Sequence, residues 1–287
     1  MTEPLDTWHV PLARARSFLF VPATRPERIV KALASGADAV IVDLEDAVAA
    51  ADKASARLAL LPALQALEPM QCGRLLLRIN AAGTSWHDGD LAALPELVRL
   101  GLGGVMLAKA ETVAALAAVA AAAGPTCALL PLIESVAGLD AADALAASSQ
   151  VLRLVFGHLD FQADAGLACA ADESELLPVR LALVLASRRA KLVAPVDGVT
   201  PNLEDSVQLA ADVARAQRGG FGAKLCIHPK QVSIVNAAFA PSAAELDWAQ
   251  RVVAGFAAAG GGVFSLDGRM VDAPVLLLAQ RTLARKK

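Results

Sequence analysis

The chain has 287 residues, of which 56% are hydrophobic and 19% are charged, and its formal net charge is −3. This composition excludes an intrinsically disordered chain, because disorder requires few apolar residues and a high net charge. It also gives no reason to expect a nucleic-acid partner, since proteins that bind nucleic acids carry a strong basic excess.

Short apolar runs of strand length alternate with amphipathic runs of helix length along most of the chain. The predicted strands are apolar on both faces, as parallel strands covered by helices must be: Ser17–Ala23, Ala39–Glu45, Leu75–Asn80, Gly104–Lys109, Ala128–Glu134, Arg153–Asp160, Leu192–Gly198 and Ala223–His228. The predicted helices between them include Pro26–Ser35, Ala54–Leu67, Leu91–Leu100, Glu111–Ala123, Glu175–Arg189 and Leu203–Arg218. Eight strands separated by helices predict a closed (β/α)8 TIM barrel, because an open doubly wound sheet normally ends at five or six strands.

One uncharged stretch, Thr112–Ile133, has the length of a transmembrane helix. Gly124-Pro125 interrupts it, so a buried helix followed by a buried strand is predicted instead, with no membrane partner. The four cysteines, which are Cys72, Cys127, Cys169 and Cys226, form no CxxC pair. Free, buried thiols of this kind are typical of a reducing compartment, and a cytoplasmic location is expected.

The residues after the eighth strand and its helix exceed what a barrel needs. We therefore expect a barrel catalytic domain over residues 1–241 and a C-terminal helical and hairpin extension over 242–287. Ser242 and Glu245 form a capping-box pattern that opens a helix to about Ala259. A short strand over Val263–Leu266, a turn at Asp267-Gly268 and a final helix from Pro274 follow. This extension is expected to pack on the barrel or on a neighbouring subunit.

Polar residues stand at the ends of seven of the eight predicted strands, where barrel enzymes carry their chemistry. The residues in question are Asp43, Glu45, Asp46, Arg78, Asn80, Lys109, Glu134, Asp160, Asp197 and His228. A single acid at a strand end is more often a structural charge than a catalytic one. Seven strands ending in this way predict a functional site at the mouth of the barrel.

The residue types restrict the chemistry of this site. Glu134 and Asp160 offer hard oxygen ligands, which suit Mg²⁺ completed by water and substrate oxygens. Arg78 suits a bidentate grip on a carboxylate, and a metal beside an arginine suits an α-keto acid or an enolate. HxH, HxxxH, GxGxxG and P-loop patterns are absent. A His-rich zinc centre, hydride transfer and P-loop phosphoryl transfer therefore lack their signatures.

Several motifs, taken in order, resemble the citrate lyase β-subunit-like family, a branch of the HpcH/HpaI aldolase and citrate lyase family within the phosphoenolpyruvate/pyruvate-binding barrel superfamily. They are Ser17-Phe-Leu-Phe-Val-Pro-Ala-Thr-Arg-Pro-Glu-Arg28, Val42-Asp-Leu-Glu-Asp-Ala-Val48, Leu77-Arg-Ile-Asn80, Met106-Leu-Ala-Lys109, Pro131-Leu-Ile-Glu-Ser135, Phe156-Gly157 with Asp160, Ile227-His-Pro229 and Gly268-Arg-Met-Val-Asp-Ala-Pro274. The resemblance covers nearly the whole chain.

The resemblance implies roles for individual residues. Glu134 and Asp160 correspond to the Mg²⁺ ligands, and Arg78 to the arginine that holds the carboxylate of a keto acid and polarises its oxygen. Glu45 and Asp46 correspond to acids beside the metal that orient its water molecules. The implied activity is carbon–carbon cleavage, or formation, of a 3-hydroxyacyl thioester such as citryl-CoA or malyl-CoA. The products are an acetyl thioester and oxaloacetate or glyoxylate.

The resemblance also implies features outside the mouth. Asp272 corresponds to a tail carboxylate that donates or accepts a proton in a neighbouring subunit's mouth, and a homotrimer or hexamer is expected. The thioester is carried by coenzyme A or an acyl carrier protein. Arg25, Arg28 and Lys31 are candidates for its phosphate groups, with a solvated helix face as the alternative.

Three further expectations concern local departures and rival functions. The family usually has Ala/Thr-Glu-Asp after Phe156-Gly157, whereas this chain has His158-Leu159-Asp160, which places His158 near the mouth. Lys53 and Arg57 are expected to be surface charges. The alternative functions are an HpcH/HpaI-type pyruvate aldolase acting on free hydroxy-keto acids, and a citrate lyase β subunit that is inactive without carrier-protein partners.

Overall fold

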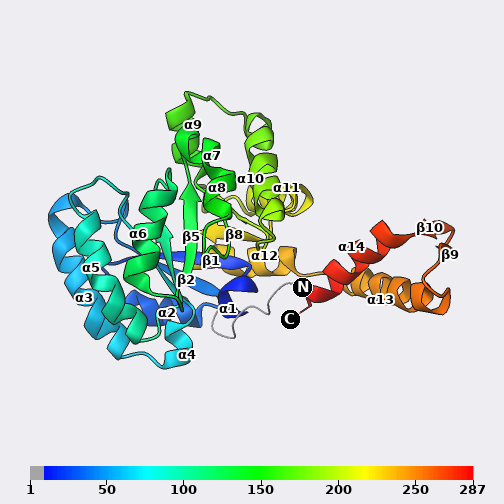
Figure 1. Cartoon of the computed structure of the whole chain (residues 1–287), viewed down its shortest axis with the longest axis horizontal. Helices are drawn as coiled ribbons and strands as arrows, with labels where there is room; N and C mark the ends of the chain where they lie inside the picture. The colour runs from blue at the N-terminus through cyan, green and yellow to red at the C-terminus, as the bar shows by residue number, and fades with distance from the viewer. Residues whose placement is uncertain (1–9, 287) are drawn as a thin grey trace. The chain divides into compact units, whose positions relative to one another are not determined.

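The protein, seen here as a computed structural model that describes residues 10–286, forms two compact units that divide between Asn236 and Ala237. In the first unit, eight parallel strands close into a barrel in chain order (Figure 1). The strands are β1 (Ser17–Pro22), β2 (Ala39–Asp43), β3 (Leu75–Ile79), β4 (Gly104–Leu107), β5 (Ala128–Ile133), β6 (Val155–Phe156), β7 (Val196–Asp197) and β8 (Ala223–Cys226). The expected TIM barrel is confirmed.

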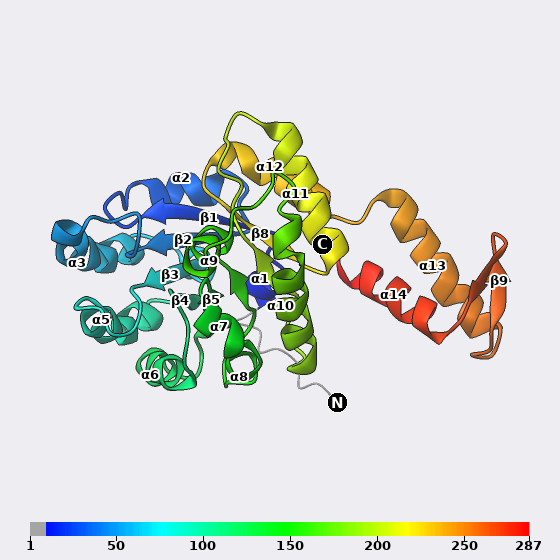
Figure 2. The same cartoon turned by 90° about the horizontal axis from the view of Figure 1, so that it is seen from above.

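Helices surround the strands, as Figure 2 shows for the barrel unit. They are α1 (Val10–Ala13), α2 (Arg28–Ala34), α3 (Lys53–Gln65), α4 (Pro69–Cys72), α5 (His87–Arg99), α6 (Val113–Ala123), α7 (Val136–Asp140), α8 (Ala142–Ala146), α9 (His158–Ala165), α10 (Leu177–Arg189), α11 (Ser206–Gly219) and α12 (Pro229–Phe239). Short 3₁₀ turns, η2 (Ala50–Asp52) and η3 (Ser174–Leu176), precede α3 and α10.

The barrel interior is filled by alternate residues of the strands, because successive side chains of a strand point to opposite faces. Phe18, Ile41, Leu76 and Leu130 belong to this buried cluster. The polar residues that follow the strands therefore emerge together at the C-terminal end of the barrel.

The sixth predicted strand, Arg153–Asp160, was too long. The ladder ends at Phe156, and His158 already begins helix α9. Asp160 therefore lies in the first turn of a helix and not at a strand end. The apolar run misled the prediction because apolar residues continue across the junction, while Gly157 breaks the strand.

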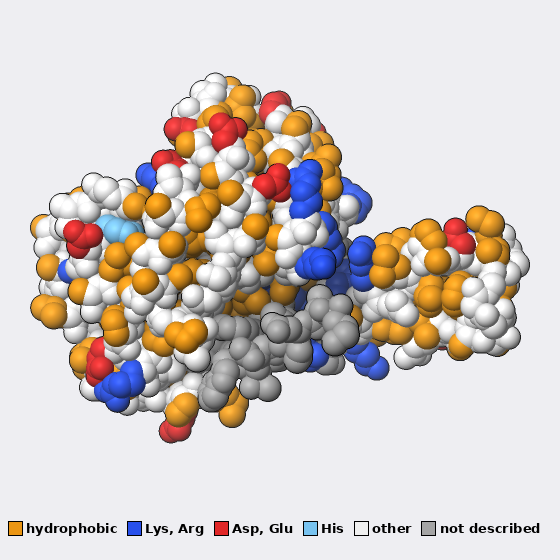
Figure 3. Space-filling view, viewed as in Figure 1, with side chains coloured by type: hydrophobic (Ala, Val, Ile, Leu, Met, Phe, Trp, Pro, Cys, Tyr) orange, Lys and Arg blue, Asp and Glu red, His pale blue; other side chains and the backbone are white. Residues whose placement is uncertain are grey.

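The uncharged stretch Thr112–Ile133 forms helix α6 and strand β5, with a break at Gly124, as expected. The helix is not fully buried, however, because only Leu116, Val119 and Ala123 of α6 are buried. Its other face is exposed alanine and valine, and the surface over α6 is orange and white in Figure 3. Alanine favours a helix without requiring burial.

Two observations concern the environment of the chain. Within residues 10–286, every helix is too short or too polar to cross a bilayer. All four cysteines are free, and Cys72, Cys127 and Cys226 are buried, whereas Cys169 is half-buried.

The second unit contains α13 (Ala243–Ala258), β9 (Phe264–Leu266), β10 (Arg269–Val271) and α14 (Ala273–Ala284). The predicted capping box is present, since Ser242 and Glu245 exchange side-chain and backbone hydrogen bonds at the start of α13. Strands β9 and β10 form an antiparallel hairpin. A small core of Ala249, Val252, Val271 and Ala279 holds the unit together. Its expected role in covering a barrel stays a prediction.

Candidate active site at the mouth of the barrel

A cavity of about 340 Å³ opens at the C-terminal ends of the strands. One part of its wall is charged and consists of Asp43, Asp46, Arg78, Glu134 and Asp160. The other part is apolar and includes Phe20, Leu132, Phe156, Leu159, Val199, Leu225 and Ile227. The strand ends thus bring together the main residues that the sequence predicted for the site.

Arg78 is the centre of the charged wall. Its Nε and Nη2 atoms donate to the two carboxylate oxygens of Asp43 at 2.7 and 2.6 Å. Its Nη1 atom lies 2.9 Å from Glu45 and 3.6 Å from Asp46, and its guanidinium lies over the ring of Phe20. Burial opposes the charge of Arg78, but these three carboxylates raise its pKa above the ordinary value. The arginine is therefore held in one orientation and remains positively charged.

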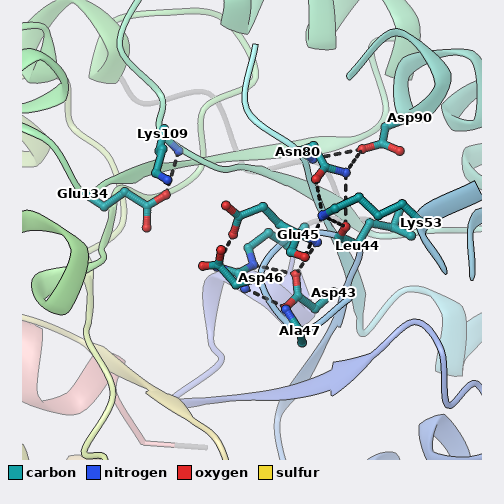
Figure 4. A network of polar contacts seen from close by, with 11 residues as sticks. Asp43, Leu44, Glu45, Asp46, Ala47, Lys53, Asn80, Asp90, Lys109 and Glu134 are labelled. Carbon is teal, nitrogen blue, oxygen red and sulfur yellow. Dashed lines mark hydrogen bonds and ion pairs between the residues drawn. The ribbon is translucent and has the colours of Figure 1, made fainter. Parts of the chain in front are cut away.

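Asp43 places the neighbouring acids as well as Arg78. It lies directly opposite Arg78 in the β2–β3 register. Its two oxygens also accept hydrogen bonds from the backbone N–H groups of Glu45 and Ala47. This turn directs Glu45 and Asp46 to the mouth (Figure 4). Burial raises the pKa of Glu45 even though Arg78 opposes the shift, and Asp46 and Asp43 raise it further.

Lys53 supports this turn from behind, and the expectation that it is a surface charge was wrong. Its ammonium group is buried and donates to the carbonyl oxygens of Leu44 and Glu45 at 2.8 and 2.7 Å, and to Asn80 at 2.6 Å (Figure 4). Asn80 in turn donates to Leu44 and Asp90. The helix-start position of Lys53 gave no sign of this in the sequence, because the acceptors come from two other segments.

Arg57, one turn further along α3, was also wrongly expected at the surface. It is mostly buried and pairs with the buried Asp90 at 2.7 Å. Asp90 thereby connects Arg57 to the cluster around Asn80. Both cations of α3 therefore bind segments next to the mouth, with Lys53 buried and Arg57 half-buried.

Glu134 follows β5 and lines the same cavity as Arg78. One carboxylate oxygen accepts the backbone N–H of Lys109 at 2.8 Å, and a left-handed backbone at Lys109, with φ 45°, accompanies this contact. The other oxygen lies against Gly157, where a Cβ would come within 2.5 Å of it. Burial, followed by the charge of Glu45, raises the pKa of Glu134 to about 8. An added positive charge would therefore stabilise the ionised carboxylate.

Asp160 and Lys109 complete this side of the mouth. Asp160 lines the cavity together with Glu134, and its charge contributes to the raised pKa of that carboxyl. Burial lowers the pKa of Lys109, but the carboxylates of Glu45, Glu134, Asp160 and Asp46 together raise it above the ordinary value. The ammonium group of Lys109 therefore lies in the field of these acids.

The donor set fits a hard divalent cation. Within the described part of the chain, no three Asp, Glu, His or Cys side chains converge into a complete metal cage. Mg²⁺ does not need one, because it is usually held by one or two carboxylates with water and substrate oxygens. Glu134 and Asp160 supply two carboxylates to one cavity, and burial followed by the charge of Glu45 raises the pKa of Glu134, so a bound cation would favour its ionised form.

His158 lies at the mouth, as its position in the sequence suggested, but its side chain is turned away from solvent. It is 2% exposed, and its Nε2 atom lies 3.1 Å from Glu173. Glu173 also pairs with Arg180 and Arg215. Burial opposes ionisation of Glu173, but hydrogen bonding and charge from His158 and Arg180 lower its pKa to about 2. The imidazole therefore fastens the segment before α10 to the barrel.

The remaining predicted residues lie outside this cavity wall. Arg25 lies before α2, Arg28 and Lys31 lie within it, and all three side chains are exposed; Arg25 pairs with Glu27 at 2.7 Å. Asp272 is in the second unit, where its side chain accepts the backbone N–H of Val275 and caps α14. Their contacts with substrate stay predictions.

The fold and the site define a class of protein. It is a (β/α)8 barrel whose mouth holds an arginine bound by carboxylates and two acids that suit a metal ion. Comparison with known families specifies it further, because residues 16–229 match the HpcH/HpaI aldolase/citrate lyase family model. The chain belongs to this family.

Individual relatives match over nearly their whole lengths. The citrate lyase subunit beta of Leuconostoc mesenteroides subsp. cremoris is 32% identical, covering 93% of this chain and 92% of the relative. A (3S)-malyl-CoA thioesterase of Cereibacter sphaeroides is 34% identical, covering 94% of each chain. The CitE protein of Mycobacterium tuberculosis, solved with magnesium, acetoacetate and coenzyme A, has a TM-score of 0.80 and 36% identity, covering 95% of this chain and 98% of that one.

Proposed function

We propose that this protein is a Mg²⁺-dependent carbon–carbon lyase that cleaves or forms a 3-hydroxyacyl thioester carrying a carboxylate. The observation that carries the proposal is the pairing, in one cavity, of Arg78 with the acids Glu134 and Asp160. The names of the relatives, among them a citrate lyase subunit and a CitE protein solved with coenzyme A, agree with a thioester as substrate. The products would be an acetyl thioester and an α-keto acid.

Glu134 and Asp160 would hold the metal ion. When bound, Mg²⁺ supplies Lewis-acid stabilisation of oxygen atoms on which negative charge develops. Glu45 and Asp46 would orient the water molecules around the ion. Lys109 fixes Glu134 through its backbone N–H, so the ligand needs little reorganisation.

Arg78 would bind the carboxylate of the substrate. A guanidinium has five N–H donors, of which Asp43 takes two and Glu45 lies against one nitrogen. Donors therefore remain for a ligand carboxylate, and the acids around Arg78 keep it aligned. Such preorganised positive charge favours the keto acid and its transition state.

The reaction breaks the bond between the hydroxyl-bearing carbon and the CH₂ carbon next to the thioester carbonyl. A carboxylate of the mouth takes up the proton of the hydroxyl group, whose oxygen becomes the carbonyl oxygen of the α-keto acid, while the electron pair of the broken bond passes to the CH₂ carbon as a thioester enolate. That carbon then takes up a proton to give the acetyl thioester. In synthesis the same steps run in reverse.

Asp272 would supply this proton, from the extension of a neighbouring subunit in a homotrimer or hexamer. General acid–base catalysis contributes about 10²–10⁴-fold, so Asp272→Asn should reduce turnover by that factor while Mg²⁺ and oxaloacetate still bind. Because Asn also caps helices well, α14 should remain intact. Full activity of the variant would exclude the proton-transfer role.

The thioester carrier would contact Arg25, Arg28 and Lys31 through its phosphate groups. These three side chains are exposed and basic, and they follow β1 at the C-terminal side of the barrel. If they bind phosphate, neutralising Arg28 should weaken coenzyme A esters more than the matching pantetheine esters. Equal effects on both would assign the three residues to a solvated helix face.

Three other functions are alternatives to the lyase, and the assay below distinguishes them. An HpcH/HpaI-type aldolase would act on free hydroxy-keto acids, and a citrate lyase β subunit would be inactive without its carrier-protein partners. The relative named a (3S)-malyl-CoA thioesterase adds hydrolysis of the thioester bond as a further possibility.

The test is an assay of the purified protein with Mg²⁺, with and without EDTA. The substrates are citryl-CoA, both enantiomers of malyl-CoA and free 4-hydroxy-2-keto acids. EDTA-sensitive release of acetyl-CoA with a keto acid supports the lyase. Free malate with coenzyme A would instead indicate a thioesterase, and cleavage of free keto acids alone an aldolase. Activity that requires an added carrier protein would indicate a partner-dependent subunit.

A further inference from the structure

The two acids proposed to hold the metal ion come from different elements. Glu134 directly precedes Ser135, the N-cap residue of α7, whereas Asp160 lies in the first turn of α9. The two helices are neighbours in the barrel unit (Figure 1). Because each acid is carried by its own segment, the relative position of α7 and α9 determines whether both carboxylates can hold one ion.

Asp164 joins these two helices through one hydrogen bond. Its Oδ2 atom, in the last turn of α9, accepts the backbone N–H of Val136, the first residue of α7, at 2.8 Å. The first N–H groups of a helix have no acceptor within that helix. Ser135 caps a different one, the N–H of Gly138, at 3.1 Å. Asp164 therefore supplies from α9 an acceptor that α7 lacks.

This hydrogen bond lies close to the two acids along both segments. Asp160 and Asp164 are four residues apart, so they lie on the same face of α9. Val136 follows Glu134 by two residues. The bond between Asp164 and Val136 thus connects the same two segments as a metal ion held by Glu134 and Asp160 would. Its loss should let α9 shift relative to α7 and change the distance between the two carboxylates.

The start of α9 has contacts of its own. Gly157, the N-cap residue, lies against Glu134, and a Cβ there would come within 2.5 Å of that carboxylate. The ring of His158 lies against Gly198, where a Cβ would come within 2.0 Å of Nδ1. Asp160 is therefore placed between these contacts and the bond of Asp164. Removal of Asp164 should loosen Asp160 without releasing the helix.

We infer that Asp164 is a positioning residue, which holds Asp160 beside Glu134 and thereby raises the Mg²⁺ affinity of the two acids. The inference rests on the metal role proposed above for these acids. Asp164 itself is exposed and lies outside the lining of the cavity, so it acts through α9 and not by contact with substrate. Loss of a group that orients metal ligands typically costs about 10–100-fold in metal affinity. Because the start of α9 stays held, the lower end of this range is expected.

The experiment measures Mg²⁺ binding by calorimetry in three variants and the unmodified protein. Asp164→Ala removes the acceptor and should raise the Kd for Mg²⁺ about tenfold. Asp164→Asn keeps a side-chain oxygen for Val136 and should restore most of the affinity. Asp143→Ala is the matched control, because Asp143 is an exposed aspartate that pairs with the exposed Arg189 on another helix. Its Kd should equal that of the unmodified protein.

Denaturant unfolding of the same variants separates positioning from a purely structural role. A hydrogen bond at the surface contributes little net stability, because water replaces the lost partner. Asp164→Ala should therefore unfold at nearly the same denaturant concentration as the Asp143→Ala control. A large drop in stability with an unchanged Kd for Mg²⁺ would assign Asp164 to the fold alone and overturn the inference.

The remaining outcomes distinguish the inference from the proposed function. An unchanged Kd in Asp164→Ala overturns the inference and leaves the lyase function standing. An equal loss of affinity in Asp164→Asn also overturns it, because the effect then follows the charge of Asp164 and not its hydrogen bond. If the unmodified protein binds no Mg²⁺, the metal site and the inference both fail. If it binds Mg²⁺ but cleaves no thioester, only the lyase function fails, and the Kd values still decide the inference.

Discussion

The barrel contains a buried arginine at each end, and the two differ in their partners. Arg153, at the N-terminal end, donates to the backbone carbonyls of Ala194 and Ala15 and lies over the ring of Phe18. Arg78, at the C-terminal end, is bound by carboxylates and lies over Phe20, two residues along the same strand. Both guanidinium groups therefore rest on neighbouring rings of β1.

The difference in partners separates a structural arginine from a functional one. Burial lowers the pKa of Arg153, because neutral carbonyls compensate its charge only in part. The acids around Arg78 have the opposite effect and leave this end of the barrel with excess negative charge. At the N-terminal end of the barrel, backbone carbonyls bind Arg153. At the C-terminal end, carboxylates bind Arg78, and this end suits a cation and an anionic ligand.

Replacing each arginine by methionine should give the largest difference in kcat/KM between the two ends of the barrel. Arg78→Met leaves buried acids without a partner, so the free energy of unfolding should fall by about 3–5 kcal/mol, and kcat/KM should fall by about 10²–10³-fold. Arg153→Met should cost about 1–3 kcal/mol for unsatisfied carbonyls and leave kcat/KM of the folded protein unchanged. Denaturant unfolding and steady-state kinetics measure both. A comparable kinetic loss in Arg153→Met would remove the distinction between the two ends.

Lys53 tests how the charged end is held in place. In Lys53→Met, three buried acceptors each lose one hydrogen-bond donor, so the turn carrying Glu45 and Asp46 should loosen. We expect kcat/KM to fall by about 10–100-fold, because a small misplacement of positioned groups can cost about 10²-fold. Lys230→Met is the matched control, since the side chain of Lys230 is exposed and pairs with the exposed Glu204. If both variants keep the rates of the unmodified protein, Lys53 has no part in positioning the mouth.

The pKa of Glu134 predicts a smaller, pH-dependent effect. Its folded value of about 8 exceeds the ordinary 4.5, so the folded state binds more protons between these values, and the free energy of unfolding falls as pH rises through this window. A metal ion must displace that proton, so Mg²⁺ affinity should rise about tenfold per pH unit up to about 8 and then level off. Calorimetry at several pH values measures this, with Glu134→Gln as control. A pH-independent affinity would show that Glu134 is not a ligand.

The sequence predicted the barrel well because strand and helix periodicities are local properties. The alternation of apolar runs and amphipathic helices sufficed for the fold, and the capping box at Ser242 sufficed for the start of α13. Predicted strands were too long wherever an apolar run continued into the next element, as between Phe156 and Asp160. Chain direction and hydrogen bonding end a strand, and composition does not report them.

For the candidate site, too, part could be predicted from the sequence and part could not. The positions of Arg78, Glu45, Asp46 and Glu134 followed from the rule that strand ends meet at one mouth, whereas Asp160 reaches the mouth from the first turn of α9. The contacts that these residues make could not be predicted from the sequence. The grip of Asp43 on Arg78 depends on the β2–β3 register, and the burial of Lys53 depends on carbonyls from β2 and an amide after β3.

By itself, the sequence determined the number and order of the barrel strands, the family and the acids and arginine of the mouth, because these depend on residue type and spacing. Only the tertiary structure decided which charges pair, which are buried and which wall of the cavity is apolar. Those properties depend on residues far apart in the chain, such as Leu159 and Ile227, which line the same cavity. Desolvation and pairing, which set the pKa of Glu134 and the orientation of Arg78, act only once the barrel has closed.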